Sequence, residues 1–264
     1  MDLQLGGKRA LVTGSTAGIG LAIAEALARE GAEVVVNGRT QERVDAALRE
    51  IRAAVPQAKL AGVAADLGSA EGAAKVVAQA PDLDILVNNV GIFAAVPFEQ
   101  IDDRQWQRIF EVNVLSGVRL ARHHLPRMLR RNFGRIVFIS SESGLQIPVE
   151  MVHYGVTKTA QLALARGLAE ATRGSDVTVN SVLPGPTRSE GVEQFVEGLA
   201  AQQRKSAEEV ERDFFQHARP TSLLQRFEDP AEIGAFVAFV ASPLGSGING
   251  ASLRVDGGVV RSIA

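Results

Sequence analysis

The sequence predicts an α/β fold in which a seven-stranded parallel sheet is doubly wound by helices. Short apolar runs alternate with longer segments of helical period, and the apolar runs contain few polar residues. Strands without a polar face are typical of a parallel sheet that is covered on both sides. The expected strands are 9–13, 32–36, 60–63, 83–87, 134–140, 177–182 and 252–255, and the expected helices are 19–30, 41–54, 70–79, 103–130, 153–173 and 230–241.

Start and stop signals support these elements in order along the chain. The first strand, RALVT, is apolar and lies between glycines, and Gly31 ends the helix that follows it. The second strand, AEVVV, leads into a helix that ends before Pro56. The last helix begins at a cap formed by Asp229, a first-turn Pro230 and an early carboxylate, Glu232.

Residues 189–224 break this alternation. The segment is charged and helix-prone, and it lies between two core elements. We interpret it as an excursion from a single domain that spans residues 1–264, because single α/β domains commonly reach this length.

Composition excludes several function classes. The net charge of −2 and the pI of about 6.1 give no electrostatic preference for nucleic acid or a membrane surface. The chain has no cysteine, so disulfides, thiolate catalysis and cysteine-ligated zinc are excluded, and the four histidines form no metal motif. Neither a signal peptide nor an apolar run of about 20 residues is evident. We therefore expect a cytoplasmic protein without a metal.

A glycine-rich turn joins the first strand to the first helix. Its sequence is TGSTAGIG, residues 13–20, with glycines at positions that permit a tight turn and close approach of a ligand. The helix start presents free N–H groups and a positive dipole end, which suit a pyrophosphate. Ordinary turn chemistry is the alternative. The cofactor contacts expected here are Gly14, Ser15, Thr16, Gly18, Ile19 and Gly20.

The second strand ends in Val36, Asn37, Gly38 and Arg39, without an acidic residue. In dinucleotide folds an acid at this place binds a ribose hydroxyl, whereas an arginine accepts a 2′-phosphate. Arg39 therefore predicts NADP(H) in preference to NAD(H), which stays possible. The alternative is that Arg39 is an ordinary exposed residue before a helix.

Tyr154 and Lys158 lie four residues apart in a helical segment, so their side chains share one face. A phenol has a pKa of about 10, and a neighbouring ammonium is expected to lower it toward a useful range. Tyr154 is the only tyrosine of the chain. Such a pair is common on helix surfaces and is persuasive only together with other motifs.

Those motifs are present in order. The glycine turn precedes Asn88-Asn89-Val90-Gly91, then Asn113, then Ser141 and the Tyr-x-x-x-Lys pair, with Pro184-Gly185 and Val255-Asp256-Gly257-Gly258 behind them. Together they resemble the short-chain dehydrogenase/reductase family over essentially the whole chain. Two departures are Val90, where the family usually has alanine, and Ser189, where it usually has threonine.

The resemblance implies a role for each matching residue. Tyr154 would exchange a proton with the substrate oxygen, Lys158 would lower the tyrosine pKa and hold the nicotinamide ribose, and Ser141 would orient the carbonyl. Asn113 would anchor a water in a proton relay. The remaining cofactor contacts implied are Asp66 and Leu67 at the adenine, Asn88 and Gly91 on the adenosine side, and Pro184, Gly185, Thr187 and Ser189 toward the nicotinamide.

The expected function is hydride transfer between NADP(H) and a carbonyl or secondary alcohol, on a small-molecule substrate. One alternative is a 3-ketoacyl thioester reductase, and another is a nucleotide-binding regulatory protein without turnover. The 189–224 segment is expected to act as a lid. Substrate candidates are Glu142, Ser143, Gln146, Glu150, Met151, His153, Phe195, Phe214 and Phe215. The alternative for Glu142 is that its side chain faces solvent. The resemblance also implies a homotetramer, or a dimer, built on helices 103–130 and 153–173.

Overall fold

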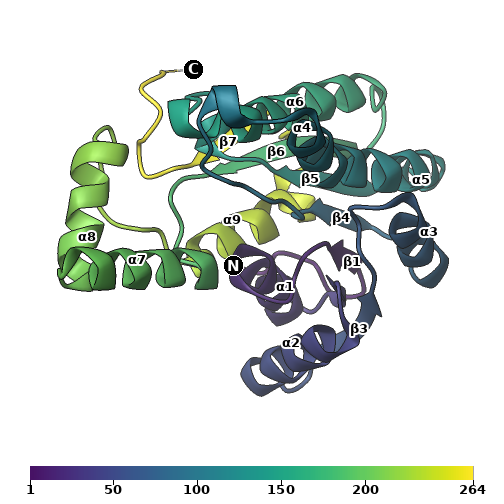
Figure 1. The fold of residues 1–264 in the computed structure, drawn as a ribbon. Coiled ribbons are helices and arrows are strands. Elements are labelled where there is room, and N and C mark those ends of the chain that lie inside the picture. Colours follow the sequence, from purple (N-terminus) through teal and green to yellow (C-terminus); the bar gives the residue numbers. More distant parts are fainter. Residues whose placement is uncertain (264) are drawn as a thin grey trace.

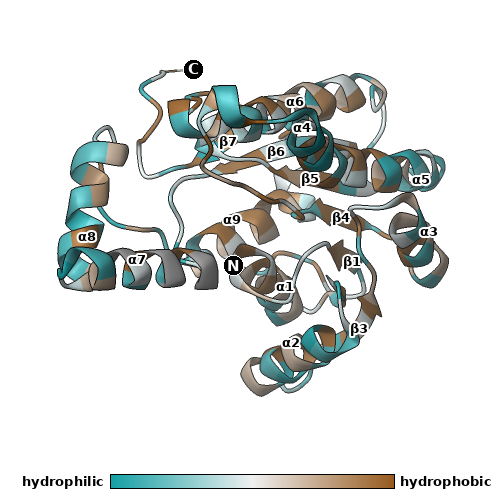
Figure 2. Ribbon diagram, viewed as in Figure 1, coloured by the Kyte–Doolittle hydropathy of each residue, from teal (hydrophilic) through white to brown (hydrophobic). Residues whose placement is uncertain are grey.

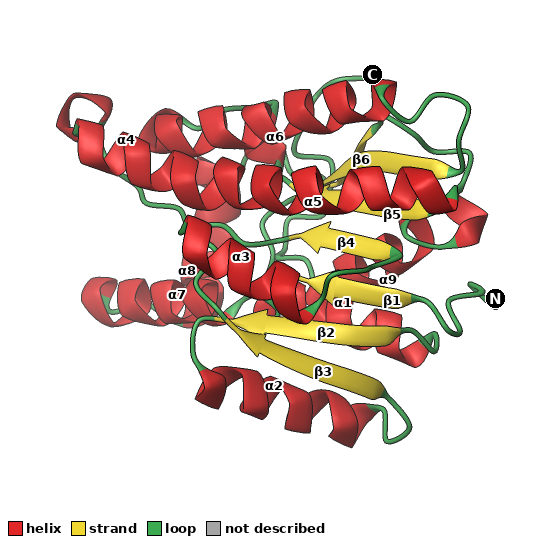
Figure 3. Ribbon diagram, turned by 90° about the vertical axis from the view of Figure 1, so that its right-hand side faces the viewer, coloured by secondary structure: helices red, strands yellow, loops and turns green. Residues whose placement is uncertain are grey.

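The computed structural model describes residues 1–263, with the side chains of all but residues 190, 191, 194, 195 and 199. Its centre is a parallel sheet of seven strands in the order β3-β2-β1-β4-β5-β6-β7 (Figure 3). This confirms the predicted fold. The strands are β1 Arg9–Val12, β2 Glu33–Gly38, β3 Lys59–Ala64, β4 Ile85–Asn88, β5 Gly134–Ile139, β6 Val177–Pro184 and β7 Ser252–Val255.

Helices cover both faces of the sheet (Figure 1). One face carries α1 Gly18–Arg29, α2 Gln41–Ala54 and α9 Pro230–Val240, and the other carries α3 Ala70–Gln79, α5 Ser116–Arg131 and α6 Val152–Glu170. Neighbouring strand residues point to opposite cores, so Val12 packs with Ile23 while Leu11 packs with Leu120. The strands are accordingly the most hydrophobic part of the ribbon (Figure 2). No helix within residues 1–263 combines the length and the apolar character needed to cross a bilayer.

The segment expected to be one helix over 103–130 is interrupted. It consists of α4 Asp103–Phe110, a π-helical turn Glu111–Leu115, and α5. A π-turn holds one residue more per turn than an α-helix, and such insertions occur often at functional sites. Here the widened turn contains Asn113, which is almost fully buried. The helix expected over 103–130 is therefore present in two parts, with the interruption at Asn113.

The excursion contains α7 Glu190–Gln203, α8 Ala207–Asp213 and a π-helical turn Phe214–Ala218. It lies beside the main body (Figure 1), on the side to which the strand arrowheads point (Figure 3). A separate small core formed by Val196, Val210, Phe215 and Phe227 holds it together. Ser189 and Ser206 cap its two α-helices.

Candidate active site

The glycine turn is built around positions where only glycine fits. Gly14 and Gly18 have φ angles of +60° and +54°, in the left-handed region. A Cβ on Gly20 would lie 2.3 Å from the carbonyl oxygen of Gly14, so the helix starts directly against the turn. Asn89 fixes this turn from β4, because its Nδ2 donates to the carbonyls of Thr13 and Gly14, both at 3.0 Å.

The N-terminus of α1 has no side-chain cap. Ala17 occupies the cap position, whereas α2, α3 and α9 are capped by Thr40, Ser69 and Asp229. Within the described part of the chain, no hydrogen-bond acceptor meets the N–H groups of residues 18–20. Free N–H groups at the positive end of a 12-residue helix fit a pyrophosphate. The turn also lies beside β4, at the point where the strand order reverses, which is where open α/β sheets bind ligands.

Ser15 does not offer its hydroxyl to this site. The side chain is fully buried, donates to the Val12 carbonyl at 2.7 Å and accepts from the Asn37 N–H at 3.0 Å. The hydroxyl of Ser15 thus holds the turn against β1 and β2, and its contact with a cofactor stays a prediction. Asn37, which sequence reasoning missed, accepts from the Gly14 N–H through Oδ1 at 3.2 Å and thereby ties β2 to the turn.

Arg39 lies where the sequence placed it, exposed just beyond β2. Its side chain has no hydrogen-bond or ion-pair partner among the described residues. A Cβ on Gly38 would lie 2.4 Å from Cγ2 of Thr16, so the end of β2 and the glycine turn touch. Arg39 is thus available to a ligand that extends from the turn.

The other residues predicted to contact the adenosine lie in different surroundings. Asp66 follows β3, accepts from the Gly68 N–H at 2.9 Å and lies 3.8 Å from Arg108. The side chain of Leu67 is buried in the core. Asn88 is also buried, and neither polar atom of its side chain has a hydrogen-bond partner in the described structure. It faces Gly117, and the side chain that holds the glycine turn is that of Asn89.

The turn after β6 approaches the site from the other side. The N–H of Gly185 donates to Oε2 of Glu228 at 3.1 Å, and Thr187 donates to the Gly185 carbonyl at 2.9 Å. Pro184 is the last residue of β6. Ser189 reaches the glycine turn, because a Cβ on Gly18 would lie 3.4 Å from its Cβ.

The predicted catalytic helix residues are brought together at the carboxyl end of β5. Lys158 is buried, and its Nζ donates to the carbonyl of Ile139 at 2.9 Å and lies 5.5 Å from the ring centroid of Tyr154. A Cβ on Gly91 would lie 3.5 Å from the same Nζ. Tyr154 and Lys158 therefore share one face of α6, as their spacing predicts.

Asn113 ties the π-turn to this helix. Its Nδ2 donates to Oγ1 of Thr157 at 3.0 Å and to the carbonyl of Ile92 at 2.9 Å. Its main-chain carbonyl accepts from Nε2 of Gln161 at 2.6 Å, and Oε1 of Gln161 accepts from Lys158 at 3.3 Å. Sequence reasoning missed Gln161, which links the two predicted residues directly.

Ser141 meets a buried ion pair. It donates to Oε2 of Glu142, while Oε1 of Glu142 accepts from Nε of Arg219 at 3.1 Å. Glu142 and Arg219 are 4% and 8% exposed. The alternative that Glu142 faces solvent is therefore wrong. Arg219, in the excursion, is a site residue that no sequence signal indicated.

Burial controls the acid–base groups. It lowers the pKa of Lys158 to about 8, against the opposing effect of the Glu142 carboxylate. It raises the pKa of Tyr154, and Glu142 raises it further, while the Ser141 side chain and the Arg219 charge lower it. The expected net lowering of the Tyr154 pKa is wrong for this structure, because desolvation of the phenolate outweighs the favourable contacts.

Three predicted substrate residues contact the excursion or its partners. Gln146 donates to Oγ1 of Thr221 at 3.3 Å, Glu150 accepts from Arg219 at 3.5 Å, and Ser143 donates to Glu142 at 3.1 Å. The segment after β5 and the excursion are thus joined by polar contacts.

The remaining candidates lie apart from these contacts. His153 is buried and packs edge-on against Trp106 at 5.9 Å, and burial lowers its pKa. Met151 is partly buried at the start of α6. Phe215 is enclosed in the small core of the excursion, with Phe214 packed against it at 5.1 Å, so the prediction that Phe215 lines the substrate pocket is wrong. The Phe195 side chain lies outside the described part of the chain.

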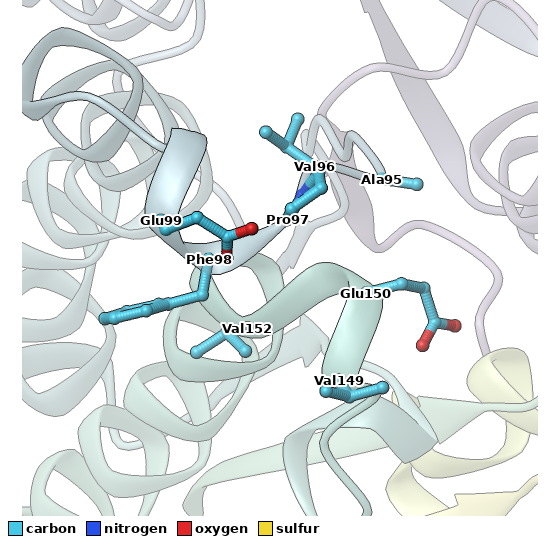
Figure 4. A pocket seen from close by; sticks show the side chains of 8 residues that line it. All are labelled: Ala95, Val96, Pro97, Phe98, Glu99, Val149, Glu150 and Val152. Atoms are coloured by element: carbon cyan, nitrogen blue, oxygen red, sulfur yellow. The ribbon is translucent and has the colours of Figure 1, made fainter.

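Phe93, which sequence reasoning also missed, packs edge-on against Tyr154 with ring centroids 6.1 Å apart. A separate cavity of about 450 Å³ lies between the segment 95–99 and the start of α6 (Figure 4). Its lining is largely apolar and includes Phe98 and Val149, together with Glu150. Neither Ser141 nor Tyr154 lines it.

Comparisons with known proteins agree with this geometry. Residues 8–200 match the short chain dehydrogenase family. The chain is 49% identical to YvaG, an uncharacterised oxidoreductase of Bacillus subtilis, over the full length of both, and 34% identical to the 3-oxoacyl-[acyl-carrier-protein] reductase FabG of Aquifex aeolicus, covering 98% of this chain and 100% of the relative. It superposes on the L-sorbose reductase of Gluconobacter frateurii, solved with NADPH and L-sorbose, with a TM-score of 0.94, 30% identity and full coverage of both chains. The chain therefore belongs to the short-chain dehydrogenase/reductase family and is an NAD(P)-dependent oxidoreductase.

Proposed function

We propose that the chain is an NADPH-dependent reductase of a small polar carbonyl compound. One observation carries the proposal: Tyr154, Lys158 and Ser141 meet at the carboxyl edge of the sheet, with the uncapped start of α1 and the exposed Arg39 at the same edge. When bound, the nicotinamide supplies or accepts the hydride.

The chain's own residues manage position and the proton. Tyr154 donates its phenol proton to the carbonyl oxygen, and its raised pKa keeps it protonated at neutral pH. Lys158 is held by Ile139 with its ammonium toward the phenol. The free N–H groups of the α1 start hold the pyrophosphate, and Arg39 pairs with a 2′-phosphate.

The substrate class follows from what surrounds Tyr154. Glu142 and Arg219 offer a buried acceptor and donor, which suit a carbonyl compound that carries further hydroxyl groups. The likeness to a reductase of L-sorbose supports the same class. A 3-oxoacyl thioester is the second candidate, favoured by the apolar cavity beside Val149 and by the likeness to the Aquifex reductase.

The test is optical. Oxidation of NADPH and of NADH is followed with L-sorbose, simple ketones and a 3-oxoacyl thioester, with the Tyr154→Phe variant as control. We expect turnover with NADPH and a polar ketone, lost by about 10²- to 10⁴-fold in the variant while NADPH binding persists. Tight cofactor binding without turnover on any carbonyl would instead favour a nucleotide-binding regulatory protein.

Assembly and location complete the proposal. We propose a homotetramer, or a dimer, built on α4–α5 and α6, which present long helical surfaces on one face. Light scattering that gives the mass of one 28.0 kDa chain would overturn this proposal of an oligomer.

A cytoplasmic location is proposed from the absence of cysteine in the sequence, and fractionation of cells tests it.

A further inference from the structure

We propose that Arg219 and Glu142 are positioning residues that hold the hydroxyl of Ser141, so that the buried ion pair between the 189–224 segment and the segment after β5 sets the hydrogen bonding around Tyr154. The inference rests on the proposed function only for its meaning in catalysis. Its physical content is a chain of contacts that runs from the excursion to the catalytic serine.

The contacts leave Ser141 little freedom. A serine hydroxyl has one proton and two lone pairs. The proton is donated to Glu142, and one lone pair accepts from the Ser143 N–H at 3.1 Å. In this structure Glu142 therefore sets the direction of the Ser141 hydroxyl, because it receives the only proton that Ser141 has.

Glu142 is held in turn by Arg219. The two residues lie 77 positions apart in the sequence, and their ion pair is buried. A second bond from Arg219 runs to Glu150 at 3.5 Å, and a third runs to the Ala218 carbonyl at 2.8 Å. Removal of one partner of such a pair leaves a buried charge unpaired, so the position of Glu142 depends on the excursion being in place.

Both charges also act on Tyr154. Glu142, which follows β5, raises the pKa of Tyr154, and Arg219, from the excursion, lowers it. The other charged group beside the phenol is Lys158 on the same helix, 5.5 Å from the ring centroid, and Phe93 covers the ring from the loop after β4. Glu142 and Arg219 are thus opposed influences on one group, and their removal has opposite signs.

A second contact between the same two segments provides a matched control. The side chain of Gln146 donates to Thr221 at 3.3 Å and has no bond to Ser141 or Glu142. The main-chain N–H of Gln146, which an alanine keeps, donates to the Glu142 carbonyl at 2.9 Å. Loss of this bond weakens docking without touching the proposed chain of contacts.

The experiment uses Tyr154 as a reporter. Because it is the only tyrosine, protein labelled with ¹³C at tyrosine Cζ gives one resonance for the phenol, without substrate or cofactor. The resonance is followed at neutral pH and through an alkaline titration in the full-length protein. Variants are Glu142→Gln, Arg219→Met, the double variant E142Q/R219M and the control Gln146→Ala.

We expect Glu142→Gln to move the resonance at neutral pH and to bring the onset of phenolate formation down by about one pH unit, as loss of one neighbouring negative charge should. Arg219→Met delays the onset, and the double variant lies between the two single variants. Gln146→Ala leaves resonance and onset unchanged. Thermal unfolding of each variant identifies any that fails to fold, and the double variant, which leaves no unpaired charge, then carries the test.

Two results overturn the inference. If Glu142→Gln and the double variant leave the resonance unchanged, Glu142 does not control the hydrogen bonding of Ser141 and Tyr154. If Gln146→Ala gives the same change as Arg219→Met, the effect belongs to docking in general. Failure of turnover on every carbonyl tested overturns the proposed function and leaves this measurement intact.

Discussion

Nζ of Lys158 donates to Oε1 of Gln161 at 3.3 Å, one helical turn further along α6. The amide nitrogen of the same Gln161 donates to the main-chain carbonyl of Asn113 at 2.6 Å, in the π-turn. Gln161 is 2% exposed, so this bridge is shielded from solvent and connects the two predicted catalytic positions on α6 and the π-turn.

Replacement of Gln161 tests the bridge. Gln161→Leu removes both bonds and leaves the Asn113 carbonyl without its amide partner, so we expect kcat for carbonyl reduction to fall by about tenfold. Gln161→Glu keeps an acceptor for Lys158 and should retain more activity than the leucine variant. The measurement is kcat and KM with NADPH for each variant. Equal kcat in the leucine variant and the unaltered protein would contradict a role in holding Lys158.

Arg39 should determine the cofactor preference. Arg39→Ala removes the only expected partner of a 2′-phosphate, so the Kd of NADPH should rise by about tenfold or more, while that of NADH changes little. Fluorescence titration with each cofactor gives both values. Arg49→Ala, an exposed arginine further along α2, is the matched control. A uniform loss for NADPH and NADH would show that Arg39 does not contact the phosphate.

Glu228 should make stability depend on pH. Burial raises its pKa from 4.5 to about 7, only partly opposed by the bond from the Gly185 N–H. Between these values the folded state binds more protons than the unfolded state, so the free energy of unfolding should fall as pH rises from about 4.5 to about 7, by at most about 3 kcal/mol, and then level off.

The measurement for Glu228 is urea unfolding at pH 5 and pH 8. Glu228→Gln removes the titrating group, so its free energy of unfolding should change less between the two pH values than that of the unaltered protein. Glu50→Gln, at an exposed position of α2, is the control. If the free energy of unfolding changes equally between the two pH values in Glu228→Gln and in the unaltered protein, the Glu228 carboxyl ionises at its ordinary pKa.

Asn37 should couple the glycine turn to the sheet. Its side chain accepts from the Gly14 N–H and donates to the carbonyls of Val63 and Ala65. Asn37→Ala leaves these buried groups unpaired, so the free energy of unfolding should fall by about 1 to 3 kcal/mol, measured by urea. Asn37→Asp sets a carboxylate against two carbonyl oxygens and should cost at least as much. If Asn37→Asp were as stable as the unaltered protein, the bonds of the Asn37 side chain would not hold the glycine turn to the sheet.

The sequence predicted the parts of the site that rest on local physics. Tyr154 and Lys158 share a face because residues four apart on a helix always do, and the glycine turn can be read from residues 13–20 alone. The sequence did not indicate which partner a polar side chain would choose. Ser15 turns inward to β1 and β2, and Asn89 holds the glycine turn while the neighbouring Asn88 does not.

By itself, the sequence determined the parallel sheet, the position of the glycine turn and the order of the catalytic residues, because each depends on hydrophobic pattern or short spacing. Only the tertiary structure decided that Arg219 meets Glu142 and that Gln161 meets Asn113, across 77 and 48 positions of sequence. Such contacts depend on how separate elements pack, and a polar side chain buried by that packing binds whichever partner the fold places within reach. The direction of the Tyr154 pKa shift has the same origin, since burial and the charge of Glu142 outweigh the effects of the Ser141 side chain and the Arg219 charge.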